Sequence, residues 1–158
     1  MRREIKLYNL IFPMWGIYFF SLVFPYFYIL LLPANFIVDT VMLFLLFALL
    51  KLPGKKALYK ESIWKAWGFG FLADILASGV LVGIHMTGAL PFNPYLPVST
   101  VAAFVFTTVG VVMAGILIYF FHRKWVWKDI AIEEGQKKKV ALGMAILTAP
   151  YLMYLPPI

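Results

Sequence analysis

The stretch AWGFGFLADILASGVLVGIHMT, residues 66–87, carries the main structural signal of this chain. Its residues are predominantly apolar, and Asp74 is its one acidic residue. An α-helix rises about 1.5 Å per residue, so about 20 residues cross a hydrocarbon core of about 30 Å. This stretch therefore predicts a transmembrane helix with a carboxyl group inside the bilayer.

Further apolar segments lie on both sides of this stretch. They cover residues 8–32, 36–52, 100–121 and 140–155. The first and third are long enough to span, whereas the second and fourth are several residues short. Residues 33–35 (Pro-Ala-Asn) separate the first two. The short last segment, which contains Pro150, could span a locally thinned bilayer or be a re-entrant or interfacial piece. Because the runs are continuously apolar, strands are not expected. We predict an all-α, polytopic transmembrane helical bundle of five helices in a single membrane domain, residues 1–158.

Composition supports this class and excludes several functions. Of the 158 residues, 63% are hydrophobic and 13% are charged, against about a quarter charged in a soluble domain. The surplus apolar surface is expected to face lipid. There is no cysteine and there are two histidines, so thiol chemistry is excluded and a catalytic metal site is not expected. Phosphate-binding glycine loops, zinc-protease helices and nucleophile elbows are absent. We therefore expect no cofactor, and the sequence argues against an enzyme.

The basic residues predict the orientation. All fourteen Lys and Arg residues lie within residues 1–7, 51–65 and 122–139. In a chain that crosses the membrane five times, these three segments lie on the same side of the membrane. Short loops rich in Lys and Arg stay in the cytoplasm. We predict an integral protein of the cell membrane, with a cytoplasmic N-terminus and an external C-terminus. The net charge of +7 is then a feature of topology, and nucleic acid is not an expected partner.

Asp74 is the strongest candidate for a functional residue. Ionisable groups inside a membrane are costly and usually face a bundle interior or a water-filled cavity. At about 100° per residue, Ser78 lies about 40° and His85 about 20° from Asp74, so the three share one polar stripe. On the segment 36–52, Asp39 follows Asn35 by one turn and is expected near the depth of His85, with which it could pair. These five residues form the predicted substrate- or ion-binding site.

Plainer interpretations stand beside this hypothesis. Asp39 could accept backbone hydrogen bonds at a helix start, and His85 could be an interfacial side chain. Gly79 and Gly83 lie on the face opposite Asp74, and their small-xxx-small spacing predicts close packing of another helix. Thr107 and Thr108 are expected to hydrogen-bond to their own helix.

The basic inner loops have two interpretations as well. Positive-inside topology alone explains them. Alternatively, they form a surface for anionic lipid headgroups or an acidic partner. The residues predicted for that surface are Arg123, Lys124, Lys137, Lys138 and Lys139, with His122 and Trp125 beside them.

Three functions compete. The first is a small transporter or channel for a small solute or ion, with Asp74 as the ion or proton group and Pro13, Pro25 and Pro150 as candidate helix breaks. It would be a homo-oligomer, because five helices seldom enclose a pathway. The second is a non-catalytic membrane subunit or assembly partner of a larger complex, in which a partner helix satisfies the polar stripe. The third is a lipid-modifying membrane enzyme. The expected partners are therefore membrane lipid and either a second copy or another membrane subunit.

Overall fold

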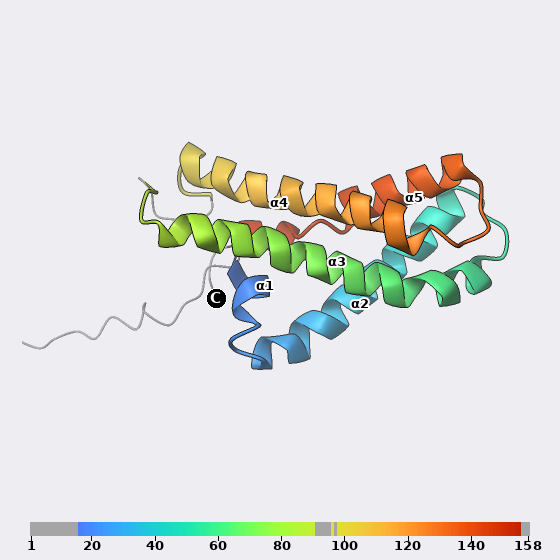
Figure 1. Ribbon diagram of the computed structural model, residues 1–158, viewed down its shortest axis with the longest axis horizontal. Helices are drawn as coiled ribbons and strands as arrows, with labels where there is room; N and C mark the ends of the chain where they lie inside the picture. The colour runs from blue at the N-terminus through green and yellow to red at the C-terminus, as the bar shows by residue number, and fades with distance from the viewer. Residues whose placement is uncertain (1–15, 91–95, 97, 156–158) are drawn as a thin grey trace, which may run out of the picture.

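The computed structural model describes residues 16–90, 96 and 98–155, and within them the secondary structure is helical without any strand. The elements in chain order are α1 (Ile17–Phe20), α2 (Tyr26–Leu49), α3 (Lys55–Met86), α4 (Val101–Phe121), the π-helix η3 (His122–Val126), α5 (Glu134–Leu147) and the 3₁₀-helix η4 (Tyr151–Tyr154). Figure 1 shows α3 and α4 side by side in opposite directions along the length of the bundle. Helix α2 begins below α3 and passes behind it toward the right-hand end, and α5 lies against both α4 and α2.

Three helices are long and apolar enough to cross a membrane. They cover Tyr28–Leu49, Lys55–Met86 and Val101–Val126. The described fold is all-helical, and the length and composition of these helices are consistent with an integral membrane protein. The predicted count of five is not reproduced in the described part of the chain, where three helices meet the requirement.

The boundary predicted at residues 33–35 is wrong. Helix α2 continues through Pro33, and the chain breaks earlier, between α1 and α2, where Pro25 caps the start of α2. A proline inside a transmembrane helix is tolerated where neighbouring helices satisfy the backbone. Pro33 removes the donor for the carbonyl four residues earlier in the helix. Next to the proline, the indole N–H of Trp67 donates to the Leu32 carbonyl at 3.2 Å, which ties α3 to α2 at this point. The start of the predicted segment 8–32 lies outside the described residues.

The predicted segment 140–155 does not form one helix. Helix α5 begins at Glu134, inside the predicted inner loop, and ends at Leu147. Its 14 residues reach about 21 Å, short of a bilayer core. Pro150 cannot donate to a continuing helix, and the Thr148 hydroxyl donates to the Met144 carbonyl at 2.8 Å as α5 ends. The chain then turns into the short η4.

The predicted inner loops are mostly helical. Helix α3 starts at Lys55, so residues 50–54 alone connect it to α2. Gly54 has φ of 63°, a left-handed conformation that favours glycine at this tight turn. Helix α4 ends at Phe121, as predicted, and the π-helix η3 continues directly from it into the predicted loop. The described Lys and Arg residues all lie at the end of the bundle where α2 and α4 end and where α3 and α5 begin, on the right of Figure 1. Which side of the membrane this end faces stays a prediction.

Small residues form the seam between α3 and α4. Ala73 and Ala77 on α3, and Ala103 and Ala114 on α4, have no exposed surface. Gly110 on α4 sits directly against the Leu81 side chain, because a Cβ built there would overlap that leucine. Without a hydrophobic driving force between helices in lipid, such close backbone approach is what stabilises their packing. The seam therefore fixes α3, and with it Asp74, in the middle of the bundle.

Candidate functional site

Two carboxyl groups are buried between α2 and α3. Asp39 is 4% exposed and Asp74 is 2% exposed. The side-chain amide of Asn35, one turn before Asp39 on α2, donates from Nδ2 to Asp74 Oδ2 at 3.4 Å. A Cβ built on Gly70 of α3 would lie 3.5 Å from Asp39 Oδ2, so this glycine leaves room beside the carboxyl. The fold thus brings Asn35, Asp39 and Asp74 into one intramembrane cluster.

Each carboxyl has an oxygen without a hydrogen-bond partner among the described residues. These atoms are Asp39 Oδ2 and Asp74 Oδ1. The two acids also repel each other electrostatically. A charged side chain at the centre of a bilayer costs about 3 kcal/mol or more when unpaired. A buried polar atom without a hydrogen-bond partner is expected to bind a proton, a water molecule or a ligand.

The short helix α1 closes the cluster from the side. The backbone N–H of Phe19 donates to Ser78 Oγ at 3.2 Å, which ties α1 to α3 one turn beyond Asp74. Tyr18 is fully buried and lies close enough to both Asp74 and Asp39 to interact with their charges. Its ring packs edge-on against Phe71 with centroids 5.9 Å apart. Sequence reasoning missed Tyr18, because one tyrosine in a long apolar segment carries no periodic signal.

A cavity of about 360 Å³ adjoins this cluster. Tyr18 from α1 and Asn35 from α2 form one wall, and the end of α5 with the segment that follows it forms the other. The lining residues are Tyr18, Asn35, Val38, Leu147, Thr148, Ala149, Pro150, Tyr151, Leu152 and Leu155. Asn35 therefore borders the cavity and hydrogen-bonds Asp74 at the same time. Sequence reasoning could not find this cavity, because it depends on where α5 ends in space.

His85 does not join the cluster. It lies about 22 Å along the α3 axis from Gly70, at about 1.5 Å per residue, and Gly70 is the residue that faces Asp39. The expected pairing of Asp39 with His85 is therefore not formed. It was based on placing Asp39 near the outer end of a helix that starts at residue 36, whereas α2 starts at Tyr26.

The two glycines of the predicted packing motif have different surroundings. A Cβ on Gly79 would lie 3.0 Å from the Phe19 ring, so α1 approaches closely there. A Cβ on Gly83 would meet nothing within 4 Å. The closest approaches between helices are instead at Gly110, against Leu81, and at Gly143 of α5, against Leu46 of α2. Gly110 and Ala114 have the small-xxx-small spacing, which sequence reasoning did not single out on α4, whereas Gly143 has no small residue four positions away.

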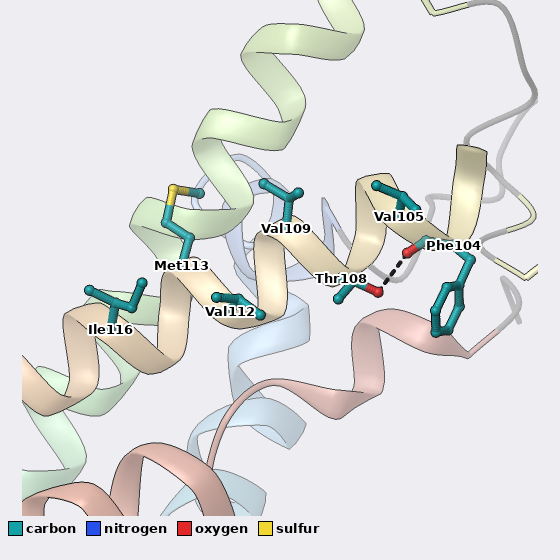
Figure 2. A pocket seen from close by; sticks show the side chains of 7 residues that line it. All are labelled: Phe104, Val105, Thr108, Val109, Val112, Met113 and Ile116. Carbon is teal, nitrogen blue, oxygen red and sulfur yellow. Dashed lines mark hydrogen bonds between the residues drawn. The ribbon is translucent and has the colours of Figure 1, made fainter. Parts of the chain in front are cut away.

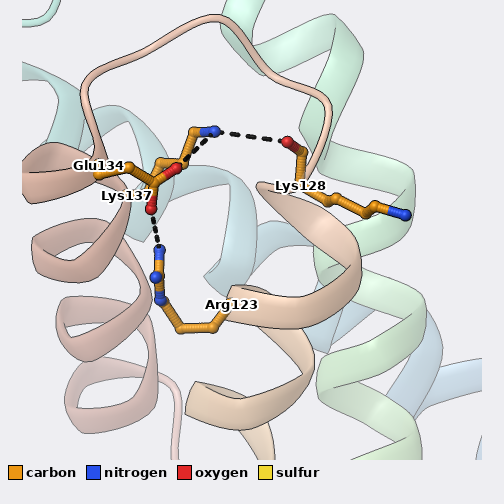
Figure 3. A network of polar contacts seen from close by, with 4 residues as sticks. All are labelled: Arg123, Lys128, Glu134 and Lys137. Carbon is orange, nitrogen blue, oxygen red and sulfur yellow. Dashed lines mark hydrogen bonds and ion pairs between the residues drawn. The ribbon is translucent and has the colours of Figure 1, made fainter.

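The predicted basic surface is partly neutralised within the protein. Figure 3 shows Glu134 between two cations: its Oε2 lies 3.2 Å from Arg123 Nη1, and its Oε1 lies 3.0 Å from Lys137 Nζ. Lys137 also donates to the Lys128 carbonyl at 3.4 Å. The hydrogen bond from Lys137, followed by that from Arg123, lowers the pKa of the Glu134 carboxyl below its ordinary value of 4.5. Arg123 and Lys137 are therefore engaged by an acid of their own chain.

The other residues predicted for this surface differ from one another. Lys138 and Lys139 are exposed. Lys124 lies over the rings of Phe120 and Trp125, at 5.4 and 5.2 Å from their centroids. His122, expected on the surface, is instead fully buried in η3. Its role as a headgroup contact is thus ruled out by its burial, because η3 turns the side chain into the core.

The π-helix creates a second buried polar group that the sequence did not reveal. Trp127 follows η3, is fully buried, and has an indole N–H without a hydrogen-bond partner among the described residues. Its ring lies 6.4 Å from that of His122 and 6.0 Å from that of Phe47 on α2. Tryptophans near the ends of transmembrane helices are typical of interfacial aromatic belts, which would place Trp127 at the surface. It packs in the core instead, because the wider turn of η3 redirects the chain inward.

Figure 2 shows a different hollow, on the outer face of α4. It is lined by Phe104, Val105, Thr108, Val109, Val112, Met113 and Ile116. Its one hydroxyl, that of Thr108, donates to the Phe104 carbonyl at 2.7 Å and accepts from Tyr154 at 2.9 Å. Thr107 likewise bonds the Ala103 carbonyl, as expected for threonines in an apolar helix. An apolar face of this kind suits lipid chains and offers no group for chemistry.

No protein-family model, no curated protein and no solved structure matches this chain. Function must therefore be inferred from the site itself. That site is the cluster of Asn35, Asp39 and Asp74, with Tyr18 and the adjoining cavity.

Proposed function

We propose that this protein is a membrane transporter for a small solute or ion, and that Asp74 is its central binding group. The observation that carries the proposal is the pair of buried carboxyls, each with an open oxygen, beside a cavity of about 360 Å³. Such groups are expensive inside a membrane and usually mark a substrate or proton pathway. Asn35 would orient Asp74, and Asp39 would supply the second acid.

Two interrupted helices beside the cluster support this proposal. Tyr18 comes from α1, which is separated from α2 by the break before Pro25, and the cavity's other wall includes Pro150 just after α5. Transporter sites are often built from such discontinuous helices, whose breaks allow the site to open to either side. A homo-oligomeric assembly, predicted from the small number of helices, remains part of the proposal.

Proton coupling follows from the same cluster. The titratable groups that face it are Asp39 from α2, Asp74 from α3 and Tyr18 from α1, with Tyr151 at the cavity wall. A buried carboxyl that binds a proton in one state and the solute in the other has a partner in both states. Its burial then costs less free energy in each. We therefore expect flux that depends on pH.

Proteoliposomes containing a trapped pH-sensitive dye test the proposal. Gradients of sodium, potassium and choline are imposed in turn, and at least one should drive a dye response in the wild-type protein. Asp74→Asn keeps the shape and removes the titration, so its flux should fall to that of protein-free liposomes. Asp129→Asn is the matched control, because Asp129 is an exposed acid at the other end of the bundle. Unaltered flux in Asp74→Asn would remove Asp74 from the mechanism.

A second candidate is a non-catalytic membrane subunit. The observation that favours it is an apolar groove of about 510 Å³ between α4 and α5, which includes Gly115 and Ala145 in its lining. A partner helix could lie there closely. A wild-type protein without flux under every gradient, together with lower thermal stability of Asp74→Asn, would put this candidate first.

A further inference from the structure

The charges around the cavity have one sign. Asn35, which lines the cavity, donates from its amide nitrogen to Asp74, and its amide oxygen is a hydrogen-bond acceptor. Behind it lie the carboxyls of Asp74 and Asp39, both buried and both with an open oxygen. In a medium of low polarity, such acids act on a ligand over a longer distance than they would in water.

The end of α5 contributes in the same direction. Leu147, its last residue, and Thr148 both line the cavity, and the last turn of α5 contains no basic residue. A helix C-terminus carries about half a negative charge from its aligned peptide dipoles. In broken transporter helices, such ends face cations.

No basic residue lines the cavity. The described Lys and Arg residues lie at the opposite end of the bundle. The remaining walls are apolar or aromatic: the side chains of Val38, Leu152 and Leu155, and the rings of Tyr18 and Tyr151. The Tyr151 hydroxyl donates to the Ile146 carbonyl, which fixes the position of this ring at the end of α5.

From these features we infer that the cavity binds a small organic cation, an amine or ammonium ion with apolar substituents. This inference deepens the proposed transport function by naming its substrate class, and it rests on that function. The negative groups attract the charge, while aromatic faces and aliphatic walls receive the substituents. A bare metal ion would need several oxygen ligands in place of these apolar walls, and an anion would be repelled.

The test measures equilibrium binding to the full-length protein in nanodiscs, without any gradient. The probes are tetramethylammonium, choline and hexylammonium, and calorimetry reports their affinities. At least one should bind saturably. The neutral analogue 3,3-dimethylbutan-1-ol has the shape of choline without its charge, and it should bind at least about tenfold more weakly than choline. Equal binding of choline and its neutral analogue, or no binding of any of the three cations, overturns the inference.

Variants locate the bound cation. Asp74→Asn should weaken cation binding about tenfold, and Asp129→Asn, which removes the same charge elsewhere, should leave the affinity unchanged. Tyr151 is half exposed, so Tyr151→Leu should fold normally while it lowers the affinity several-fold; Tyr151→Phe keeps the ring and should retain most of the affinity. Unchanged affinity in both Asp74→Asn and Tyr151→Leu would show that the cation binds elsewhere and would overturn the inference.

The binding and flux experiments test the two proposals independently. Cation binding without flux would leave the cation site in place and refute transport. Flux of sodium or potassium without binding of any organic cation would leave transport in place and refute the substrate class.

Discussion

Glu134 and Asp74 are two acids of one chain with opposite surroundings. Glu134 is exposed at the charged end of the bundle and is paired with both Arg123 and Lys137. Asp74 is buried in the middle of the bundle, with one amide hydrogen bond from Asn35 and one open oxygen. Glu134 has its ion-pair partners at the surface, where water could also hydrogen-bond the carboxylate. Asp74 is unsatisfied where this is most costly, and that difference points to a role in binding.

The two halves of the bundle also differ in what lies next to their hydrophobic cores. At the charged end, Phe47 and Trp127 form part of a continuous hydrophobic core with α5. In the other half, the core around Tyr18, Leu81 and Met153 lies next to the polar cluster and its cavity. Both halves therefore hold helices together, and the second half also contains the polar cluster and the adjoining cavity.

The largest expected effect comes from removing the acid beside Gly70. Asp39→Leu should abolish flux in the liposome assay. It should also raise the free energy of unfolding by about 1–3 kcal/mol, because an unsatisfied buried polar group is replaced by an apolar one. Chemical denaturation in detergent measures this change. A lower stability would indicate that Asp39 is paired in the folded protein, and the contrast between the two regions would then be lost.

The second prediction concerns the seam that holds α3 in place. Gly110→Leu should lower the free energy of unfolding by about 1–3 kcal/mol, since the added side chain collides with Leu81. Gly83→Leu is the matched control, because nothing lies within 4 Å of a Cβ at Gly83. Thermal unfolding of the two variants in the same detergent compares them. Equal destabilisation would contradict the assignment of the close helix contact to Gly110 and would indicate that Gly83 also packs against a neighbour.

The smallest effect is expected at the charged end. The pKa of Glu134 is lowered in the folded protein, so its ion pairs stabilise the fold above the ordinary pKa of 4.5, and this contribution is lost as the pH falls through the lowered value. The Glu134 side chain is exposed, so the contribution is small. Glu134→Gln should leave the melting temperature at pH 7 almost unchanged and should remove the slight loss of stability below pH 4.5. A large drop at pH 7 would contradict the assignment of this network to the surface.

Sequence alone identified the class of protein and much of the cluster. Continuous apolar runs located the two long helices α3 and α4, because hydropathy is a local property that needs no tertiary contact. The third span, Tyr28–Leu49, was not located, because a helix break was expected at residues 33–35. Asp74 and Asp39 stood out because an acid in an apolar run is costly wherever the neighbours lie. Asn35 was included because it precedes Asp39 by one turn.

Tertiary structure decided the rest. Residues 33–35 resemble a helix break, yet α2 passes through them while Trp67 of α3 hydrogen-bonds the Leu32 carbonyl beside Pro33. That register places Asp39 beside Gly70 and far from His85. Tyr18 and the end of α5 meet at the cavity although they are far apart in the sequence. The physical reason is that a helix break and a binding site depend on which groups satisfy one another in space, and periodicity along one segment does not contain that information.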